Sequence, residues 1–215
     1  MNDSRQRLRI ALPKGRLYDP TVACLARAGV IVDPDPGRRL LLPSNDPLIE
    51  FLVVKPGDVS VYVESGAADL GVTGTDVLRE SDPDLLEPLE LGFGACRLVV
   101  ANQASDPWPD LPGGQTARVA SKYPRIAWRH FAALGKPVEI ISVHGSVEVA
   151  PLLGLAHWIV DLVDTGNTLK ANGLMERETI LQVGAVLVAN RASQKLKLEA
   201  HLALMARLDP VKGDR

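Results

Sequence analysis

Short apolar runs alternate with helical patterns along most of this 215-residue chain. The run 8–12 stops at Pro13-Lys14-Gly15, and apolar residues then recur at helical spacing until Gly29. Later runs at 48–54 and 69–72 are each followed by a glycine-containing turn and a short helical pattern. Chains with this alternation fold as layered α/β sheets whose parallel strands are joined through helices. We therefore predict a mostly parallel α/β sheet in the first part of the chain.

The alternation pauses around 90–94, and a second set of strand and helix patterns begins at 96–101. An apolar run at 180–189, followed by a polar helix to about Leu208, is long enough to return to the first set. The sequence thus predicts two lobes: 1–92 with about 184–215, and about 93–183. In open α/β folds a ligand binds at the carboxyl ends of strands, and two crossovers predict a binding cleft between the lobes.

Composition excludes several functional classes. The 24 basic and 26 acidic residues are interspersed and give a net charge of −2, which argues against a broad surface for nucleic acid or membrane. The chain has no apolar stretch of membrane-spanning length and no signal-peptide pattern, so we expect a cytoplasmic protein. Cys24 and Cys96 fit no metal-binding spacing. P-loop, nucleophile-elbow and zinc-protease motifs are also missing from the sequence.

The strongest local signal is a buried strand pattern at 158–163 that leads into Thr165-Gly166-Asn167-Thr168. Such a turn presents backbone N–H groups, and its threonine hydroxyls add donors for a phosphate. The acidic Asp161 and Asp164 suit a ligand that also carries sugar hydroxyls or magnesium, and a phosphorylated ribose with a pyrophosphate supplies both. The alternative is that Thr165 or Asn167 only caps the following helix.

A second signal is cationic. Lys14 and Arg16 flank Gly15 between the first strand and the first helix, and Lys55 ends the next strand. Lysine supplies a point charge and arginine a bidentate fork, so this turn suits a diphosphate or triphosphate. The alternative is a solvated basic turn, because cations at a helix start oppose the helix dipole.

Three further features are weaker. Lys122, after a strand of the second lobe, either meets a ligand or is an exposed loop lysine. Ser146 and Glu148 join a strand to a helix, where Ser146 is a natural N-cap and Glu148 favours the helix dipole. Glycines at 71 and 74 either let a flat ring lie against the backbone or serve tight turns.

The segments line up, in order, with one family. Those that closely resemble ATP phosphoribosyltransferase are 12–17, 55–59, 62–78, 120–124, 144–151, 161–174 and 188–193. The resemblance implies a two-lobed α/β fold like that of type II periplasmic binding proteins, with mixed sheets and helices on both faces. It implies transfer of phosphoribose from phosphoribosyl pyrophosphate to N1 of ATP, the first step of histidine biosynthesis. It also implies magnesium carried by the substrate, with no metal site of the protein's own.

The chain resembles the short form of the family, without a C-terminal regulatory domain. Short forms work with a regulatory subunit resembling histidyl-tRNA synthetase (HisZ-like), so we expect a hetero-oligomer built on a catalytic dimer. The implied catalytic residues are Lys14, Arg16 and Lys55. The implied phosphoribosyl pyrophosphate ligands are Asp161, Asp164, Thr165, Gly166, Asn167 and Thr168. The implied ATP ligands are Gly15, Gly74, Thr75, Lys122, Tyr123, Ser146 and Glu148.

The chain departs from the family pattern at Lys55, where arginine is frequent, and at His157, where the family usually has aspartate. We assign His157 no role. Separated acids at 161 and 164, with Asn167 inside the turn, favour this family over salvage phosphoribosyltransferases. The alternatives are such a salvage enzyme, a two-lobed solute-binding protein, and the effector domain of a transcription regulator.

Overall fold

The computed structural model describes residues 7–32 and 39–209. The chain divides into two compact units, which we call unit 1 (Met1–Ala95 with Gly184–Arg215) and unit 2 (Cys96–Val183). Unit 1 contains β1 (Leu8–Pro13), α1 (Tyr18–Arg27), β2 (Leu41–Pro43), β3 (Ile49–Val54), the 3₁₀ turn η2 (Pro56–Asp58), α2 (Val59–Glu64), β4 (Leu70–Gly74), α3 (Thr75–Ser81), β5 (Leu86–Glu90), β11 (Ala185–Ala189), α7 (Arg191–Leu196) and α8 (Leu198–Leu208). Unit 2 contains β6 (Cys96–Gln103), the 3₁₀ turn η3 (Pro112–Gly114), β7 (Ala117–Ser121), α4 (Pro124–Ala133), β8 (Val138–Ser142), α5 (Val149–Leu152), β9 (Trp158–Val163), α6 (Asn167–Ala171) and β10 (Leu174–Val183).

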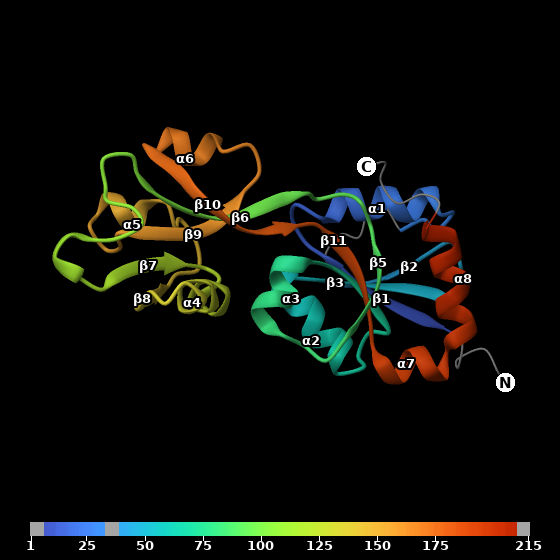
Figure 1. Ribbon diagram of the computed structural model, residues 1–215. Coiled ribbons are helices and arrows are strands. Elements are labelled where there is room, and N and C mark those ends of the chain that lie inside the picture. The colour runs from blue at the N-terminus through green and yellow to red at the C-terminus, as the bar shows by residue number, and fades with distance from the viewer. Residues whose placement is uncertain (1–6, 33–38, 210–215) are drawn as a thin grey trace. The chain divides into compact units, whose positions relative to one another are not determined.

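The sheet of unit 1 has the order β2-β3-β1-β4-β11-β5. Strands β3, β1 and β4 are parallel at its centre, and the remaining pairs are antiparallel. Helices α1 and α8 pack apolar side chains on one face, and α2 and α3 pack on the other (Figure 1). This arrangement brings the carboxyl ends of β3, β1 and β4 to one edge of the sheet, and the prediction of helices on both faces is confirmed for this unit.

Gly71 lets α2 approach the sheet closely. A Cβ atom at this position would lie 2.6 Å from Cγ1 of Val59 and 2.8 Å from Cγ2 of Val63, which is too close for either contact. Both valines are fully buried on α2, so no side chain fits at position 71 without moving the helix. The sequence left open two roles for this glycine, contact with a flat ring or a tight turn. Helix packing explains the glycine without either of them.

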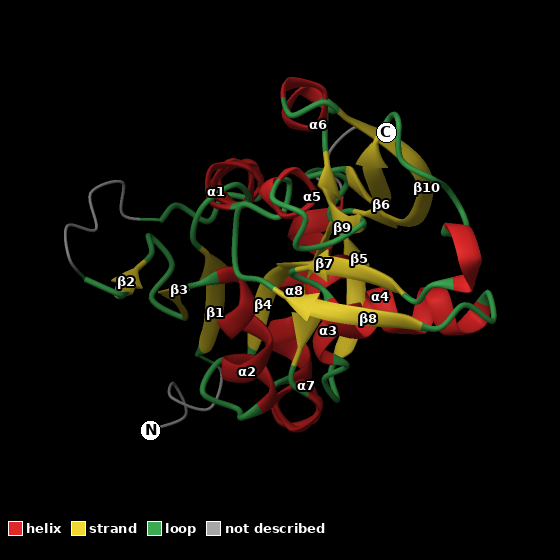
Figure 2. Cartoon of the chain, turned by 90° about the vertical axis from the view of Figure 1, so that its left-hand side faces the viewer, coloured by secondary structure: helices red, strands yellow, loops and turns green. Residues whose placement is uncertain are grey.

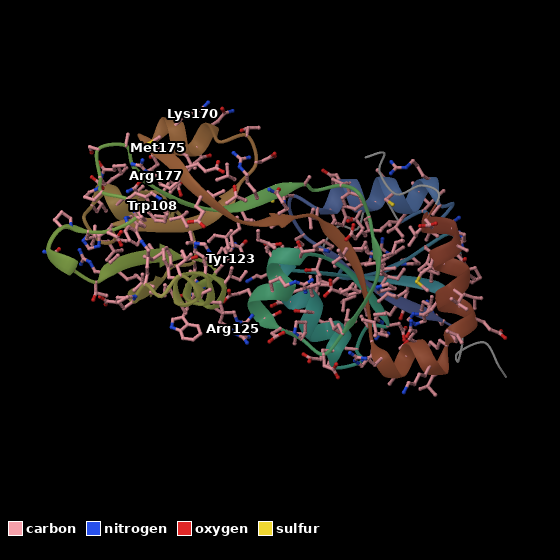
Figure 3. All side chains as sticks on the ribbon, viewed as in Figure 1. Trp108, Tyr123, Arg125, Lys170, Met175 and Arg177 are labelled. Carbon is pink, nitrogen blue, oxygen red and sulfur yellow. The ribbon has the colours of Figure 1, made fainter. Side chains whose placement is uncertain are left out.

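The sheet of unit 2 has the order β10-β6-β9-β7-β8, with β9, β7 and β8 parallel. Helix α4 covers one face through Ile126, Ala127 and Phe131, while α5 and α6 cover the other (Figure 2). Arg177, labelled in Figure 3, donates from Nε to Oδ1 of Asn102 at 2.5 Å and from Nη2 to the carbonyls of Gln103 and Ala104. These bonds fasten the loop after β6 against β10.

The prediction of a mostly parallel sheet was wrong. Each sheet has three adjacent parallel strands, which lie at the centre in unit 1 and at one edge in unit 2. Antiparallel pairs adjoin them on both sides in unit 1 and on one side in unit 2. Strand β11 causes much of the difference, because it returns from unit 2 and inserts between β4 and β5, antiparallel to both. The run predicted at 180–189 is also divided between β10 and β11, and the polar helix predicted after it is two helices, α7 and α8.

Two of the segments that resemble the family meet in a buried polar cluster of unit 1. The Asp69 carboxylate accepts hydrogen bonds from Ser193 Oγ at 2.5 Å and from Lys197 Nζ at 2.7 Å. Ser193 Oγ also lies 3.0 Å from Nε2 of His201, which is fully buried. Because Asp69 precedes β4, this cluster lies at the amino edge of the sheet, and it fastens α7 and α8 to the strand.

Candidate functional site

Two of the predicted cations stand side by side at the carboxyl edge of unit 1. Pro13 at the end of β1 pairs with Val54 at the end of β3 in parallel register, so Lys14 and Lys55 follow on neighbouring strands. The backbone N–H of Lys14 continues the ladder with a 2.7 Å bond to the carbonyl of Val54. Both lysines are exposed, and their charges add at one edge because the strands end together.

Arg16 lies in the turn between β1 and α1, and its guanidinium is exposed. The turn is made possible by Gly15, whose φ of 80° lies in the left-handed region. One guanidinium nitrogen, Nη1, donates to the carbonyl of Gly94 at 3.2 Å. The contact places the guanidinium on the same edge as Lys14, next to the segment that leaves unit 1 after β5.

Gly74 is the last residue of β4 and Thr75 the first residue after it, on the same edge. Thr75 donates its backbone N–H to the carbonyl of Gly184 at 3.0 Å, and its Oγ1 accepts from the backbone N–H of Gly184 at 3.3 Å. A Cβ at position 74 would collide with Oδ1 of Asp76, so any other residue there would require the Asp76 side chain to move. Besides Arg16, this edge therefore carries five predicted residues, which come from three strand ends of unit 1: Lys14, Gly15, Lys55, Gly74 and Thr75.

The corresponding edge of unit 2 carries carboxylates. In the parallel pair of β7 and β9, Ser121 lies opposite Val160, so Lys122 and Asp161 come next on neighbouring strands. Strand β8 ends level with β7, and the loop after it reaches Glu148 at the start of α5. Asp161 shares the side of β9 that carries Ile159 and Val163, which is the side that α5 and α6 cover, because side chains alternate along a strand.

The six predicted phosphoribosyl pyrophosphate ligands line one pocket of about 290 Å³ in unit 2. Its wall is formed by residues 161–169 together with Glu148. Gly166 turns the chain with a φ of 80°, and Leu169 is buried beneath the loop. Helix α6 begins after Gly166 with no side-chain cap, so the alternative that Thr165 or Asn167 only caps this helix was wrong. Glu148, predicted to bind ATP, lies in this pocket with the turn 165–168, which we call the phosphate loop after its predicted ligand.

The half-buried position of Asp161 raises the pKa of its carboxyl above the ordinary value, mainly by desolvation. A hydrogen bond of 2.8 Å from the backbone N–H of Leu162 to Oδ1 opposes this effect. The charge of Glu148 raises the pKa further, while that of Lys122 lowers it. Asp161, Glu148 and Lys122 are therefore electrostatically coupled, and a ligand hydroxyl or cation beside the two acids would relieve their repulsion.

Three further residues of unit 2 that the sequence singled out are Ser146, Tyr123 and His157. Ser146 has a φ of 50° and does not cap α5, which begins at Val149 with Glu148 in the cap position, so the N-cap interpretation was wrong. Tyr123 is 6% exposed and packs in the core beneath α4, where Figure 3 labels it. His157 has a structural role, because its Nδ1 accepts from the backbone N–H of Arg118 at 2.9 Å.

Comparison with known proteins identifies the family. The family model of HisG, ATP phosphoribosyltransferase, matches residues 55–210. An ATP phosphoribosyltransferase of Sorangium cellulosum is 51% identical over 203 residues, covering 94% of each chain. One of Acidithiobacillus ferrooxidans is 46% identical over 204 residues, covering 93% of this chain and 95% of the relative. The chain belongs to the ATP phosphoribosyltransferase family. Its activity is that of a pentosyl transferase in the first step of histidine biosynthesis, as the resemblance predicted.

Solved structures agree with this assignment. The ATP phosphoribosyl transferase (HisG:HisZ) complex from Thermotoga maritima matches with a TM-score of 0.83 and 34% identity, covering 95% of this chain and 98% of that one. A protein titled Tv2483 bound to L-arginine matches with a TM-score of 0.60 at 13% identity, which is a likeness of fold alone. The predicted fold class, two-lobed with mixed sheets, is confirmed. In the part of the chain that the structure describes, no helix is long and apolar enough to span a membrane.

Proposed function

We propose that this ATP phosphoribosyltransferase binds phosphoribosyl pyrophosphate through the pocket of unit 2 and transfers its phosphoribose to N1 of ATP. The observation that carries the proposal is that Asp161, Asp164 and the turn 165–168 line one pocket. The turn offers backbone N–H groups and threonine hydroxyls to the 5-phosphate, and the exposed Asp164 and half-buried Asp161 accept hydrogen bonds from ribose hydroxyls.

Transfer breaks the bond between the anomeric carbon and pyrophosphate and forms a bond from that carbon to N1 of adenine. The ribosyl centre carries positive charge in the transition state, so fixed carboxylates near the ribose stabilise it more than they stabilise the ground state. Glu148 lies in the same pocket and adds to this negative field. Because of this position, we propose that Glu148 binds a ribose, either that of phosphoribosyl pyrophosphate or that of the neighbouring ATP.

The cationic edge of unit 1 suits the leaving pyrophosphate and the triphosphate of ATP. Lys14 and Lys55 supply two point charges on neighbouring strands, and Arg16 supplies a planar fork. Magnesium carried by the substrate would neutralise further charge on the leaving group. Among residues 7–32 and 39–209 no group of three His, Cys, Asp or Glu side chains is placed to hold a metal ion. We propose that the pyrophosphate supplies most of the magnesium ligands.

The adenine N1 carries a lone pair at neutral pH, so the reaction needs no general base. Holding the two substrates in line with the anomeric carbon then provides much of the rate enhancement. The remaining ATP assignments, Gly15, Gly74, Thr75, Lys122, Tyr123 and Ser146, follow from the resemblance. For Tyr123 the burial of the side chain favours a backbone contact.

We also propose a regulatory partner. The Thermotoga structure is titled as a HisG:HisZ complex, and it matches this chain over 95% of its length. A hetero-oligomer built on a catalytic dimer, with a subunit resembling histidyl-tRNA synthetase and located in the cytoplasm, is the corresponding expectation for this chain.

The test is the ultraviolet absorbance gain on mixing the purified protein with ATP, phosphoribosyl pyrophosphate and magnesium. The assay is run with and without the HisZ-like partner, and with free adenine in place of ATP as the control. Product formed with ATP but not with free adenine supports the proposal. A rate that depends on the HisZ-like partner shows that the partner regulates the enzyme. Product from free adenine would instead indicate a salvage enzyme. Absence of product in every mixture, with ligand binding retained, would indicate a binding protein.

A further inference from the structure

Arg97 lies beneath the start of the phosphate loop. It belongs to β6, where it pairs with Val163 of β9 on one side and with Gln182 of β10 on the other. Its backbone is therefore held between two neighbouring strands. Its side chain carries Nη1 to the carbonyl oxygen of Asp164 at 3.0 Å. Asp164 is the first residue after β9, so this bond is made where the strand gives way to the loop.

The rest of the guanidinium is fixed by Glu176 of β10. Nε donates to Oε1 at 2.9 Å, and Nη2 donates to Oε2 at 2.7 Å, which is the fork geometry of a bidentate pair. Thr179 Oγ1 donates to Oε1 of the same carboxylate at 3.0 Å. With Nε and Nη2 on the carboxylate, Nη1 is left to point at Asp164. Hydrogen bonds from Arg97 lower the pKa of Glu176, so the carboxylate is charged at neutral pH.

We infer that Arg97, oriented by Glu176, is a positioning residue for the phosphoribosyl pyrophosphate loop. It fixes the carbonyl of Asp164, and with it the direction in which residues 165–168 leave the strand. The far end of the loop is held separately by the buried Leu169. A loop fixed at both ends presents its N–H groups without first losing the entropy of ordering them.

The inference rests on the proposed function, because it assigns the loop to phosphoribosyl pyrophosphate. Arg97 is not among the residues that line the pocket, so we assign it an effect on substrate binding through the loop. Its loss should therefore weaken phosphoribosyl pyrophosphate binding while leaving ATP binding nearly unchanged.

The test measures KM for both substrates, kcat, and direct binding of phosphoribosyl pyrophosphate by calorimetry. It uses the full chain, with the HisZ-like partner where the wild type requires it. We expect Arg97→Gln to raise KM and Kd for phosphoribosyl pyrophosphate about 10- to 100-fold, as loss of a charge-assisted hydrogen bond does. KM for ATP should stay within about twofold. Glu176→Gln leaves the guanidinium of Arg97 in place but weakens the contacts that orient its Nη1. It should raise KM and Kd for phosphoribosyl pyrophosphate less, about 3- to 10-fold.

Two variants serve as controls. Lys170→Gln removes a nearby cation, because Lys170 is exposed on α6 (Figure 3) and does not line the pocket. Arg79→Gln breaks another arginine–glutamate fork, in which Nη1 and Nη2 of Arg79 lie 2.8 and 3.2 Å from the Glu87 oxygens in unit 1. Both variants should keep wild-type constants. Arg97→Lys, which restores the charge but not the fork, should recover only part of the affinity.

An unchanged KM and Kd for phosphoribosyl pyrophosphate in Arg97→Gln would overturn the inference. An equal rise in KM for ATP, or a loss of activity that follows a fall in melting temperature, would also overturn it, because Arg97 would then serve only the folding of unit 2. The proposed function fails in a different way. In that case the wild type itself forms no phosphoribosyl-ATP, whatever the variants do.

Discussion

The two units present the same strand geometry with opposite charge. In each, three parallel strands run to one edge, and the predicted functional residues lie at or just after the strand ends. Unit 1 places Lys14, Arg16 and Lys55 at its edge, whereas unit 2 places Glu148 and Asp161 beside a single lysine. The carboxyl edge of parallel strands thus decides where a site lies, and the side chains after each strand decide what it binds.

The units also differ in how their loops are fixed. The phosphate loop of unit 2 is held from below by Arg97 and Leu169. The contacts of Arg16 and Thr75 in unit 1 go to Gly94 and Gly184, on the segments that lead to and from unit 2. Substituting a cationic residue at the edge of unit 1 should therefore affect catalysis mainly by removing its charge, whereas a substitution at Arg97 should act by moving the loop.

The largest effect is expected at the cationic edge. If Arg16 faces the developing phosphate charge, as proposed, Arg16→Ala removes that fork and kcat/KM should fall about 100- to 1000-fold. The measurement is initial rate against both substrates. Arg79→Ala is the control, because Arg79 pairs with Glu87 on another part of unit 1. Near-normal turnover in Arg16→Ala would show that Arg16 is not part of the site. It would also contradict the proposal that this edge binds the phosphate groups.

At the acidic edge, Asp161→Asn should lower kcat about 10- to 100-fold, because a neutral amide stabilises the ribosyl cation less. The same change should raise the melting temperature at pH 7. The pKa of Asp161 is raised by burial, so its charge destabilises the fold above that pKa.

The stability difference between Asp161→Asn and the wild type should shrink as pH falls through the raised pKa, since the wild-type carboxyl is then also neutral. Thermal melts from pH 7 to pH 3 check this. A less stable variant at pH 7 would mean that the carboxylate is satisfied by partners in the fold and not held ready for a ligand.

A smaller effect is expected away from both edges, at His201. Burial lowers the pKa of this imidazole, and Lys197 lowers it further, while Asp69 opposes them. As pH falls below about 6.5, His201 takes up a proton in the unfolded chain before it does so in the folded one. The free energy of unfolding therefore decreases as pH falls through this range. His201→Gln should show a flatter melting temperature between pH 7 and 5, with unchanged KM values. An equal slope in both proteins would place the pH sensitivity elsewhere.

The smallest effect is expected for Lys55→Arg. A bidentate fork in place of a point charge should lower KM for the substrate whose phosphates it meets by about two- to fivefold. Comparing KM for ATP with KM for phosphoribosyl pyrophosphate shows which phosphates those are. Lys55→Met should raise the same constant, and if neither variant moves either KM, Lys55 does not contact substrate.

Much of the fold was predictable where the signal is local. Apolar runs located β1, β3, β4 and β9 to within about two residues. Strands β2 and β5 were missed. Both are short and only partly buried edge strands of unit 1, so their sequences lack a clear apolar pattern.

The site was predictable to a similar degree. The turn at 165–168 with its two aspartates could be found because all its members are close in sequence. Arg97 could not, since it sits within a strand pattern and acts on a residue 67 positions away in the chain. Ser146 was misread as a helix cap because its left-handed backbone depends on the loop around it.

By itself, the sequence determined the family, the reaction and the positions of several strands along the chain, because motifs and apolar periodicity are written in neighbouring residues. Only the tertiary structure decided that β11 inserts antiparallel between β4 and β5, that Asp69 and Ser193 form a buried structural cluster, and that Glu148 lies in the pocket of the phosphate loop. These features join residues that are distant in the chain, and their partners are selected by packing and hydrogen bonding that no local pattern records.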